Sequence, residues 1–565
     1  MEKTCIKCKQ IFPISEADLA MYAKLSPQVG SKVLAIPTPT LCRLCRLQRR
    51  LAYRNERNFY PRKCSATGED IIAIYNETAK FPVYNQKTWW GDSWDPKAFG
   101  RDFDFSRPLF DQLAEQRDQV PRLALLSYTS ENSTYTNHSG DNKNCYLSTI
   151  VWECEDVYFG RKVFNSRLVF DSTFIIHNGQ ILYQCCWGEN LYNCQFTNFC
   201  NNSSNLKFCH NCKSSKDCFM SSNLRNKQYV FVNEQLSKEA YETKLATIDL
   251  GSRKVLDKYQ AEFTKLCETT IKQAQHIDKC ENATGDYLLE CKDMHMCFCG
   301  YRAESCRYCI EYDGAGGMKM VRDCMDAYGF GESELLYEVQ GQSNGYNNKF
   351  CSLSFNVADS LYLDMCFGVK NCFGCVGLHN KEQYCILNKQ YSKEEYEQLV
   401  PKIVDQLIAN GEWGEFFPAR ISPFGYNESD AKNFFPLTKE KAREQGFHWS
   451  DYVTPTPSIK TISASELPDN IKDTDTSILN VAIECSVSKK PFRILKQELD
   501  FYQQNNIALP QKHPEVRYTE RIAAINLPYL YDGQCSSCQK ALATSYSPEK
   551  QNNLYCQVCY EKMLY

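Results

Sequence analysis

The sequence predicts a mainly β protein with α insertions, in which a parallel β-solenoid in two runs is flanked by duplicated zinc-ribbon or treble-clef-like end modules. Three observations lead to this prediction. Residues 142–391 repeat short Cys- and aromatic-rich units and end twice in nearly the same way. C-x2-C knuckles lie near both ends of the chain. The last part of the chain also repeats the residue pattern of the first part.

The central stretch consists of units of the form polar–Asn/Asp/Ser–Cys/Leu–aromatic, such as NKNCYL at residues 142–147. Its ending occurs in two copies, as the matched pairs Cys212/Cys366, Cys218/Cys372 and Leu224/Leu378 show. Such a unit corresponds to one short strand and a turn, and it cannot bury its apolar face alone, so successive units must stack. We therefore expect parallel strands in two runs, at about 142–233 and 280–391, with reduced cysteines filling a narrow interior.

A string of small metal knuckles is the alternative for this stretch, because Cys209/Cys212 and Cys306/Cys309 are also C-x2-C pairs. Most of the cysteines recur with the repeat rather than in groups of four, which favours the solenoid. One unit, RDCMDAYG at residues 322–329, follows a wider gap after residue 306.

Composition limits the class of protein. A chain of 565 residues is long enough for several domains with sizeable cores. Its 32 cysteines follow no apolar signal region, and no apolar stretch is long enough to span a membrane. We therefore expect a cytoplasmic protein with reduced thiols and no membrane association. The net charge of −3 means that any nucleic-acid surface must be local.

Two sets of four cysteines are the candidate metal ligands. The N-terminal set is Cys5, Cys8, Cys42 and Cys45, and four thiolates can close tetrahedrally around zinc. The C-terminal set has the spacing of a zinc ribbon and consists of Cys535, Cys538, Cys556 and Cys559. The alternative for the first set is four buried free cysteines. We expect two structural zinc ions and no zinc catalysis, because a closed four-thiolate site leaves no open coordination position.

The two ends of the chain match beyond these knuckles. A C-x6-F-x6-L-x2-Y pattern begins at Cys5 and again at Cys485. Further along, residues match at a constant offset of 471 positions, among them Arg46/Arg517, Arg50/Arg521 and Cys64/Cys535. Each copy keeps one complete metal site, while Cys64 and Cys485 are what is left of the two incomplete ones. We therefore interpret the C-terminal module as a copy of the N-terminal one.

The stretch from Cys42 to Cys64 is strongly basic, with Glu56 as its only acid. On a helix its arginines share one face and its leucines another. Guanidinium groups match phosphate oxygens, and nearby Tyr and Phe rings offer stacking surfaces. The alternative is an Arg-rich helix that pairs with the acids of residues 92–118. The candidate nucleic-acid-binding residues are Arg43, Arg46, Arg49, Arg50, Arg54, Arg57, Arg62 and Lys63.

Seven segments follow from these patterns. A helical hairpin is expected between the two solenoid runs, and the S-K-E-E sequence at Ser392 predicts a capping box and a helix that ends near Asn410. The segments are an N-terminal zinc module with a basic helix (1–90), an aromatic and acidic connector (91–141), solenoid run 1 (142–235), the helical hairpin (236–279), solenoid run 2 with its capping helix (280–411), a second connector (412–482) and the C-terminal zinc-ribbon module (483–565).

Several specific motifs carry a family resemblance. They include RNERNFYPRKCSATGEDIIAIY (54–75), WWGDSWDPKAFGRDFDFSRPLF (89–110) and CFGCVGLHNKEQYCILNKQYSKEEY (372–396). In these motifs most of the chain resembles a family of zinc-ribbon proteins with Cys-rich repeats from small-genome bacteria of the candidate phyla radiation. The resemblance implies zinc binding and a Cys-rich repeat centre. It implies no particular activity.

Three hypotheses for function result. The first is a non-catalytic zinc protein that binds nucleic acid, as RNA, the ribosome or the DNA backbone, through residues 43–63, with salt-sensitive contacts. The second is a protein-interaction scaffold that uses the solenoid surface. The third is a glycan-active β-helix enzyme, which needs a carboxylate pair or a Lys/Arg base on one exposed strand face. The sequence shows no convincing set of this kind, so no catalytic residue is predicted.

Overall fold

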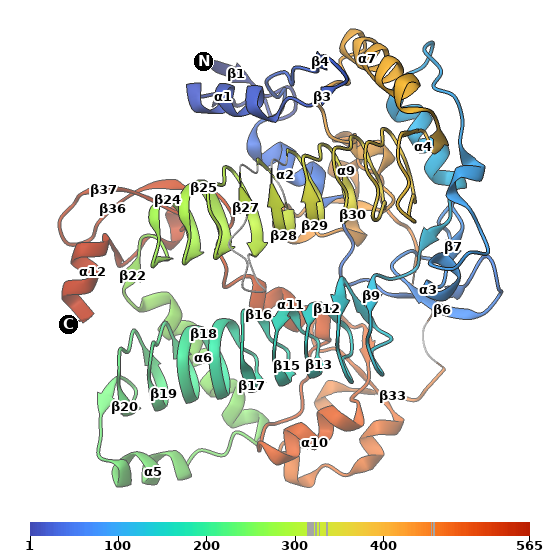
Figure 1. Cartoon of the computed structure of the whole chain (residues 1–565). Helices are drawn as coiled ribbons and strands as arrows, with labels where there is room; N and C mark the ends of the chain where they lie inside the picture. The colour runs from blue at the N-terminus through green and yellow to red at the C-terminus, as the bar shows by residue number, and fades with distance from the viewer. Residues whose placement is uncertain are drawn as a thin grey trace. The chain divides into compact units, whose positions relative to one another are not determined.

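The chain divides into two compact units, and each unit joins one end of the chain to a distant repeat region (Figure 1). The computed structural model describes residues 1–313, 321–322, 325–326, 328–334, 337–453, 455 and 458–564. Part of the predicted repeat unit at 322–329, including Cys324, lies outside the described residues. Unit 1 consists of residues 1–125, 275–452 and 528–530, and unit 2 consists of residues 126–274, 453–527 and 531–565.

Each unit contains a large parallel sheet in which paired residues lie twelve positions apart at most places. In unit 2, Lys216 on β19 pairs with Gln228 on β20. In unit 1, Gln340 on β29 pairs with Ser352 on β30, and isolated bridges continue the pattern to Ile386. The chain is therefore mostly β, with twelve α-helices among the residues that the structure describes.

Most strands of these two sheets are short, apart from β18, β24 and β25, and they follow one another closely in sequence. The 13-stranded sheet of unit 2 contains β9 (Ser127–Tyr128), β10 (Thr136–Asn137), β11 (Ser139–Gly140), β12 (Ser148–Trp152), β13 (Glu155–Tyr158), β14 (Arg161–Phe164), β15 (Arg167–Phe170), β16 (Thr173–Ile175), β17 (Gly179–Tyr183), β18 (Cys186–His210), β19 (Lys216–Ser222), β20 (Gln228–Phe231) and β21 (Glu234–Gln235). The 8-stranded sheet of unit 1 contains β23 (Ile277–Asp278), β24 (Glu281–Leu289), β25 (Lys292–Tyr301), β26 (Ile310–Asp313), β27 (Val321–Arg322), β28 (Tyr328–Glu334), β29 (Gln340–Tyr346) and β30 (Ser352–Phe355).

Within the twelve-residue repeat, the backbone conformation itself repeats every three residues. Backbone φ is positive at every third residue over long stretches, for example at Asn190, Asn193, Phe196, Phe199 and Asn202. Asn and Asp enter this left-handed region at the lowest cost among non-glycine residues, because their short side chains can hydrogen-bond nearby. The amide of Asn190 donates to the side-chain oxygen of Asn202, one repeat further on, at 2.8 Å. The twelve-residue repeat thus consists of four three-residue segments, which explains its richness in Asn and Asp.

The inward position of each segment is filled mainly by Cys, Val, Leu and Ser. In unit 2 the buried cluster inside the repeat includes Cys194, Cys200, Cys209 and Cys218. The thiol of Cys200 donates to the carbonyls of Asn198 and Cys209, each at 3.5 Å. The hydroxyl of Ser203 makes the same kind of bond to Asn201. These cysteines are therefore buried, as predicted, and they also act as hydrogen-bond donors to the repeat backbone.

Within the described part of the repeat regions, the structure does not support the metal-knuckle alternative. The thiols of its two C-x2-C pairs donate to backbone carbonyls, as Cys209 does to Lys207 at 3.5 Å and Cys306 does to Glu304 at 3.4 Å. Among the described residues, groups of metal-ligating side chains occur only at the two predicted quartets near the chain ends.

Helices follow both repeat regions, as predicted. α5 (Lys238–Ala246) and α6 (Arg253–Thr269) form the expected helical pair, and α7 (Lys393–Ala409) begins at the predicted capping box of Ser392 and Glu395. α9 (Lys439–Glu444) is a short helix within the second connector. No helix in the described parts of the chain has both the length and the apolar character needed to cross a membrane.

The two end modules have the same order of elements, at the offsets seen in the sequence. Each module has a first β-hairpin, two helices and a second β-hairpin. In unit 1 these are β1 (Glu2–Thr4), β2 (Ile11–Pro13), α1 (Glu16–Leu25), α2 (Arg43–Leu51), β5 (Tyr60–Lys63) and β6 (Asp70–Ala73). In unit 2 they are β34 (Ala482–Glu484), β35 (Pro491–Phe492), α10 (Lys496–Gln504), α11 (Pro514–Ile522), β36 (Tyr531–Gln534) and β37 (Ala541–Thr544).

Two boundaries differ from the predicted ones. The expected connector at 91–141 contains α4 (Leu109–Gln119) and the strands β9 to β11, which already belong to the sheet of unit 2. The first module also continues past residue 90, because β7 (Val83–Tyr84) pairs with β8 (Arg122–Leu123). Aromatic and acidic composition therefore did not distinguish a connector from the start of the repeat.

Candidate metal centres and buried arginine clusters

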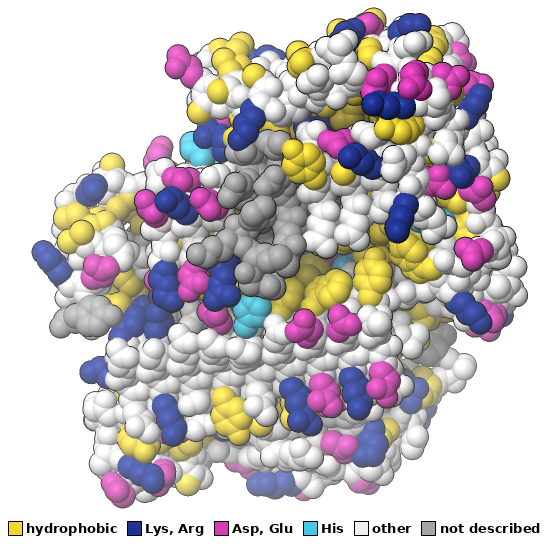
Figure 2. Space-filling view, viewed as in Figure 1, with side chains coloured by type: hydrophobic (Ala, Val, Ile, Leu, Met, Phe, Trp, Pro, Cys, Tyr) yellow, Lys and Arg dark blue, Asp and Glu magenta, His cyan; other side chains and the backbone are white. Residues whose placement is uncertain are grey.

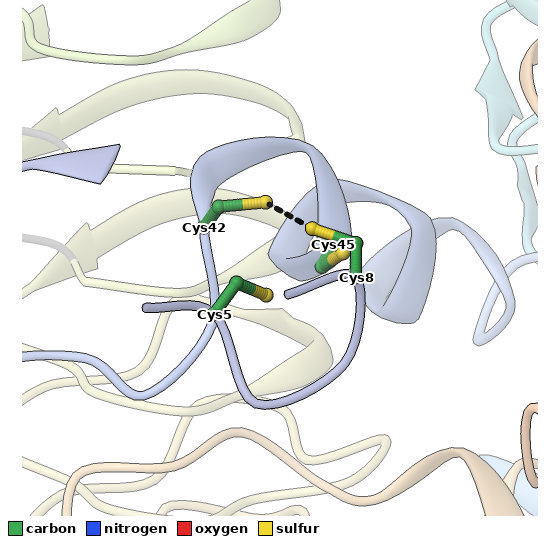
Figure 3. Close-up of side chains that lie close together, drawn as sticks. All are labelled: Cys5, Cys8, Cys42 and Cys45. Atoms are coloured by element: carbon green, nitrogen blue, oxygen red, sulfur yellow. Dashed lines mark hydrogen bonds between the residues drawn. The ribbon is translucent and has the colours of Figure 1, made fainter. Parts of the chain in front are cut away.

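The first candidate metal centre joins a hairpin to a helix in unit 1 (Figure 3). Cys5 and Cys8 lie on the turn between β1 and β2, Cys42 is the N-cap of α2, and Cys45 lies on the first turn of that helix. All four sulfur atoms lie within 4.8 Å of one another, and the Sγ atoms of Cys8 and Cys42 are 3.7 Å apart. Cys8 is exposed, and the other three side chains are buried.

This geometry fits a tetrahedral four-thiolate site. With metal–sulfur bonds of about 2.3 Å, the sulfur–sulfur edge of a tetrahedron is roughly 3.8 Å. A hydrogen bond from Cys45 lowers the pKa of the Cys42 thiol to about 5. The N-terminus of α2 also favours negative charge at this position. The four side chains could therefore hold one divalent metal ion and leave no position open for a substrate.

The second candidate metal centre has the same arrangement in unit 2. Cys535 and Cys538 lie on the turn between β36 and β37, Cys556 immediately precedes α12 (Gln557–Leu564), and Cys559 lies within that helix. The four sulfur atoms lie within 4.8 Å of one another, and Cys538 and Cys556 are 3.8 Å apart. Burial raises the pKa of Cys535, but the backbone N–H groups of Cys538 and Cys556 outweigh it and hold the pKa at about 6. The eight predicted ligands thus gather in two quartets.

The two incomplete sites keep an N–H···S hydrogen bond to the remaining cysteine. The Sγ of Cys64 accepts from the N–H of Asn85 at 3.4 Å, and the Sγ of Cys485 accepts from the N–H of His513 at 3.1 Å. Cys535 accepts from the N–H of Cys556 in the complete site at 3.4 Å. A backbone donor therefore faces the sulfur whether or not the other ligands are present.

The arginines of α2 are buried in ion pairs with the repeat region of unit 1. Arg46 lies 2.6 Å from Asp326, and Arg50 lies 3.5 Å from the same carboxylate. Arg49 lies 2.7 Å from Glu338. Both acids are fully buried and have positive φ, at 60° for Asp326 and 43° for Glu338. Left-handed positions of the repeat thus supply the carboxylates that hold α2.

Burial and ion pairing weigh against a direct contact of these three arginines with nucleic acid. Buried guanidinium groups depend on their carboxylate partners, so a phosphate would first have to break those pairs. The alternative, an Arg-rich helix held by ion pairs, agrees better with these contacts. Its partners, however, are Asp326, Glu338 and Glu415 and not the acids of residues 92–118. On the face shown in Figure 2, Lys and Arg side chains lie among Asp and Glu side chains.

The remaining residues of the basic stretch do not form a common surface either. α2 ends at Leu51, so Arg54 does not continue its face, and Arg54 forms a buried pair with Glu56 at 2.6 Å. Arg43 donates to the carbonyl of Pro528 and Arg62 to that of Asn76, and both side chains are half-buried, as is Arg57. Lys63 is the only exposed member of the eight, and it pairs with Asp70 at 2.8 Å.

Unit 2 contains the same arrangement. Arg517 and Arg521 of α11 are the counterparts of Arg46 and Arg50, and both pair with the buried Asp171. Asp171 also has positive φ, at 48°. We call each set an Arg–Asp cluster. The clusters are Arg46, Arg50 and Asp326 in unit 1, and Arg517, Arg521 and Asp171 in unit 2.

A tyrosine pair lies beside each cluster. In unit 1 the ring of Tyr22 on α1 meets Tyr337 edge-on, with centroids 5.4 Å apart. In unit 2 the ring of Tyr502 on α10 meets Tyr183 edge-on, with centroids 5.6 Å apart. The same two helices of each end module therefore contact the same kind of repeat surface.

Sequence reasoning missed the Arg–Asp clusters. It treated the arginines of the basic stretch as a candidate phosphate-binding surface. The two arginines of each cluster are, however, the ones retained in both copies. The available signal was the constant offset of Arg46/Arg517 and Arg50/Arg521.

The molecule is therefore a mostly β protein with two candidate four-cysteine metal centres and two Arg–Asp clusters. The chain matches no known protein family and no curated protein sequence. Among solved structures it is matched with a putative acetyltransferase from Desulfovibrio desulfuricans G20, at 7% sequence identity over 50% of this chain and 81% of the other, with a TM-score of 0.10. At that TM-score the match carries no argument about fold or activity.

Proposed function

We propose that this chain is a non-catalytic scaffold in which two β-solenoid runs, each held to a zinc-stabilised end module, present their outer surface to protein partners. Parallel pairing at a twelve-residue interval and buried columns of small side chains support the solenoid. Four thiolates at tetrahedral spacing support zinc, which prefers this ligand set. A closed site of this type stabilises structure rather than catalysing a reaction.

The pairing of the arginines inside the units is the observation that carries this proposal. The strongest basic cluster of the chain contacts the buried carboxylates Asp326 and Glu338 and holds a module to its repeat region. The remaining exposed surface of the repeats is built largely from hydrogen-bonded side chains at left-handed positions, such as Asn193, Asn205 and Asp217. An ordered polar surface with single exposed aromatic residues, such as Tyr192 at 49% exposure, suits contact with another protein.

Binding experiments on the intact, metal-loaded protein distinguish the scaffold from the nucleic-acid hypothesis. Fluorescence anisotropy with a structured RNA and a duplex DNA, over a salt series from about 50 to 200 mM, reports phosphate contacts through the slope of affinity against salt. We expect no binding tighter than the micromolar range that is typical of non-specific contacts. Tight binding with a steep salt dependence would overturn the proposal.

Affinity capture from cells, with and without nuclease treatment, tests the scaffold directly. We expect the same protein partners in both samples, and a weaker signal with Tyr192→Ser. The matched control is Val232→Ser, which changes an exposed apolar side chain elsewhere in unit 2. Loss of every partner after nuclease treatment would instead support nucleic-acid binding through residues other than the buried arginines. The glycan-enzyme hypothesis stays a prediction, to be tested with polysaccharide substrates.

A further inference from the structure

A cavity of about 460 Å³ in unit 1 has two buried charges of opposite sign in its wall. Its lining comes from residues 74–76 and 78–81, the second half of α4, residues 420–425 and 428, and residues 448–451. Arg117 of α4 is 7% exposed and Glu428 is 9% exposed. The volume lies within the range of pockets that bind small molecules.

Arg117 differs from the other buried arginines of unit 1. Arg46 and Arg122 each have a carboxylate partner, at 2.6 Å from Asp326 and 2.8 Å from Asp364 respectively. Arg117 has no carboxylate partner among the residues that the structure describes, and its buried Nε has no hydrogen-bond partner. An uncompensated buried guanidinium is costly, so an anion is the group that this position lacks.

Glu428 has the complementary arrangement. Its carboxylate accepts hydrogen bonds from the hydroxyl of Tyr60 at 2.9 Å, the amide of Asn76 at 2.7 Å and the N–H of Gly425 at 3.0 Å. All three donors are neutral, and within the described ranges no Lys or Arg pairs with it. A carboxylate has about four lone-pair sites, so one acceptor position is left for a cationic donor.

The other charges of the cavity wall are neutralised or exposed. Arg420 pairs with Asp111 at 2.6 Å, and Asp451 pairs with Lys439 at 2.6 Å. Lys80 and Asp118 are exposed to solvent. The burial of His448, together with the positive charge of Arg117, lowers the pKa of that histidine, while Glu428 opposes the shift, so one imidazole lies within electrostatic reach of both buried charges.

We propose that this cavity binds a small zwitterion of the amino-acid class, with its carboxylate on Arg117 and its ammonium group on Glu428. The planar guanidinium matches a carboxylate, and an ammonium group can donate to the remaining lone pair of Glu428. The stacked rings of Tyr75 and Phe424, with centroids 5.2 Å apart, offer an apolar wall for the side chain of the ligand. Such a ligand neutralises both buried charges at once.

Calorimetry and thermal-shift measurements on the full, metal-loaded chain test this proposal. The probes are the twenty standard amino acids, followed by the N-acetyl and carboxamide derivatives of the best binder. We expect submillimolar binding of at least one amino acid, and a loss of about tenfold or more in affinity when either charge of the ligand is removed. No binding by any amino acid, or equal binding of the N-acetyl derivative, would overturn the proposal.

Variants assign the two ends of the ligand. Arg117→Met should weaken the amino acid by about tenfold but leave its carboxamide unchanged, and Glu428→Gln should abolish the preference for the free amine. Arg420→Met is the matched control, because that arginine lies in the same wall but already has a partner, and it should bind as the unmodified chain does. Arg117→Lys keeps the charge if the Met variant fails to fold. Equal weakening by Arg420→Met would contradict the assignment.

A second inference rests on a different observation, at the positions beside the Arg–Asp clusters. In unit 1, Arg49 pairs with Glu338. The counterpart of Arg49 at the offset of 471 positions is Glu520. The counterpart of Glu338 in unit 2 is Gln184. Both residues have positive φ, and each directly follows the repeat tyrosine, Tyr337 or Tyr183, whose ring contacts a tyrosine of the end module. The N–H of Glu338 donates to Met325 and that of Gln184 to Phe170, which are the residues before the two cluster aspartates.

We infer that these two positions decide which end module docks on which repeat region. The N-terminal module pairs Arg49 with Glu338. In the C-terminal module the corresponding acid, Glu520, is exposed and pairs with Lys512 at 2.6 Å, and the corresponding repeat position is the neutral Gln184. If the modules were exchanged, Glu520 would face Glu338, and Arg49 would be buried against Gln184 without a carboxylate. Both outcomes are unfavourable, so the correct pairing is specified by repulsion as well as by attraction.

A double-mutant cycle in unit 2 of the full chain tests this second inference. Gln184→Glu should lower the folding equilibrium constant by about tenfold, because two acids then face each other, and Glu520→Arg in the same chain should restore it. Urea unfolding followed by circular dichroism is the measurement. Asn178→Asp, at another left-handed position of the same sheet, is the control and should have little effect. Additive effects of the two substitutions would overturn the inference.

Discussion

The Nε atom of Arg46 lies 2.6 Å from Oδ2 of Asp326, and both side chains are almost completely buried. In unit 2, Asp171 receives Arg517 and Arg521 in the same way. A single carboxylate at a left-handed position of each repeat region thus pairs with two guanidinium groups of an end module. The duplication of the chain therefore extends to the contact between module and repeat.

Removal of either aspartate should unfold its unit more easily. Asp326→Asn and Asp171→Asn keep the shape of the side chain but leave two buried arginines without their main counter-charge. Breaking a buried pair in this way costs about 3–5 kcal/mol. Urea unfolding, followed by tryptophan fluorescence and circular dichroism, measures the loss.

An exposed ion pair supplies the control for that experiment. Lys63 and Asp70 are 2.8 Å apart, but their side chains are 66% and 86% exposed. Asp70→Asn should change the free energy of unfolding by about 1 kcal/mol or less, because solvent screens exposed pairs. A similar loss for Asp70→Asn and Asp326→Asn would show that burial is not the source of the effect.

The general plan of the fold could be predicted because its period is visible in the residues. Cys212/Cys366 and Cys218/Cys372 mark two copies of one repeat, and Ser392 with Glu395 marks the start of a helix. The three-residue period was not recognised, because aromatic residues such as Phe196 and Phe199 share the left-handed positions with Asn and Asp. Propensity alone does not place a phenylalanine at such a position, since the stacking of repeats there outweighs its local preference.

The two cysteine quartets could be predicted from the sequence, whereas the contacts of the arginines could not. Cys5 and Cys8 are only three positions apart, as are Cys535 and Cys538, so each C-x2-C pair can be recognised within a short stretch of sequence. The partner of Arg46 is 280 positions away in the sequence, and Asp326 is one acid among many. Local charge therefore suggested an exposed basic surface, whereas the long-range contact that neutralises it becomes visible only in the folded unit.

Metal analysis should find two zinc ions per chain. Cys8→Ser should reduce this to one ion and destabilise only unit 1, and Cys538→Ser should reduce it to one ion and destabilise only unit 2. Cys64→Ser and Cys485→Ser are the matched controls, because neither residue belongs to a quartet, and both should retain two ions. Mass spectrometry under native conditions gives the count, and a chelator series gives the stability. Four or more ions would contradict the assignment of the repeat cysteines to hydrogen bonding.

Thiol reactivity should be higher at Cys280 than at Cys218, another cysteine of the repeat regions. A hydrogen bond from Cys291 lowers the pKa of Cys280 to about 7, and its side chain is half-buried. Burial instead raises the pKa of Cys218 to about 12. Because the thiolate is the reactive form, Cys280 should be alkylated at least about tenfold faster than Cys218 at pH 8. Iodoacetamide labelling of the native, zinc-loaded protein with peptide mass spectrometry measures both rates, and comparable rates would contradict the packing described for this region.

The stability of unit 2 should fall as pH rises through neutrality, because of Glu498. Burial raises the pKa of this carboxyl to about 7, although Arg517 opposes the shift. The folded state then holds a proton that the unfolded chain, with an ordinary pKa near 4.5, has already released. The stabilisation that Glu498 contributes is therefore complete below pH 4.5 and is lost as pH rises through about 7. The free energy of unfolding should fall by about 2–3 kcal/mol between pH 5 and pH 8.

Urea unfolding of the zinc-saturated chain at these two pH values measures the change. Glu498→Gln carries no titrating group at this position, so the difference between the two curves isolates Glu498, and identical pH profiles for the two chains would refute the prediction.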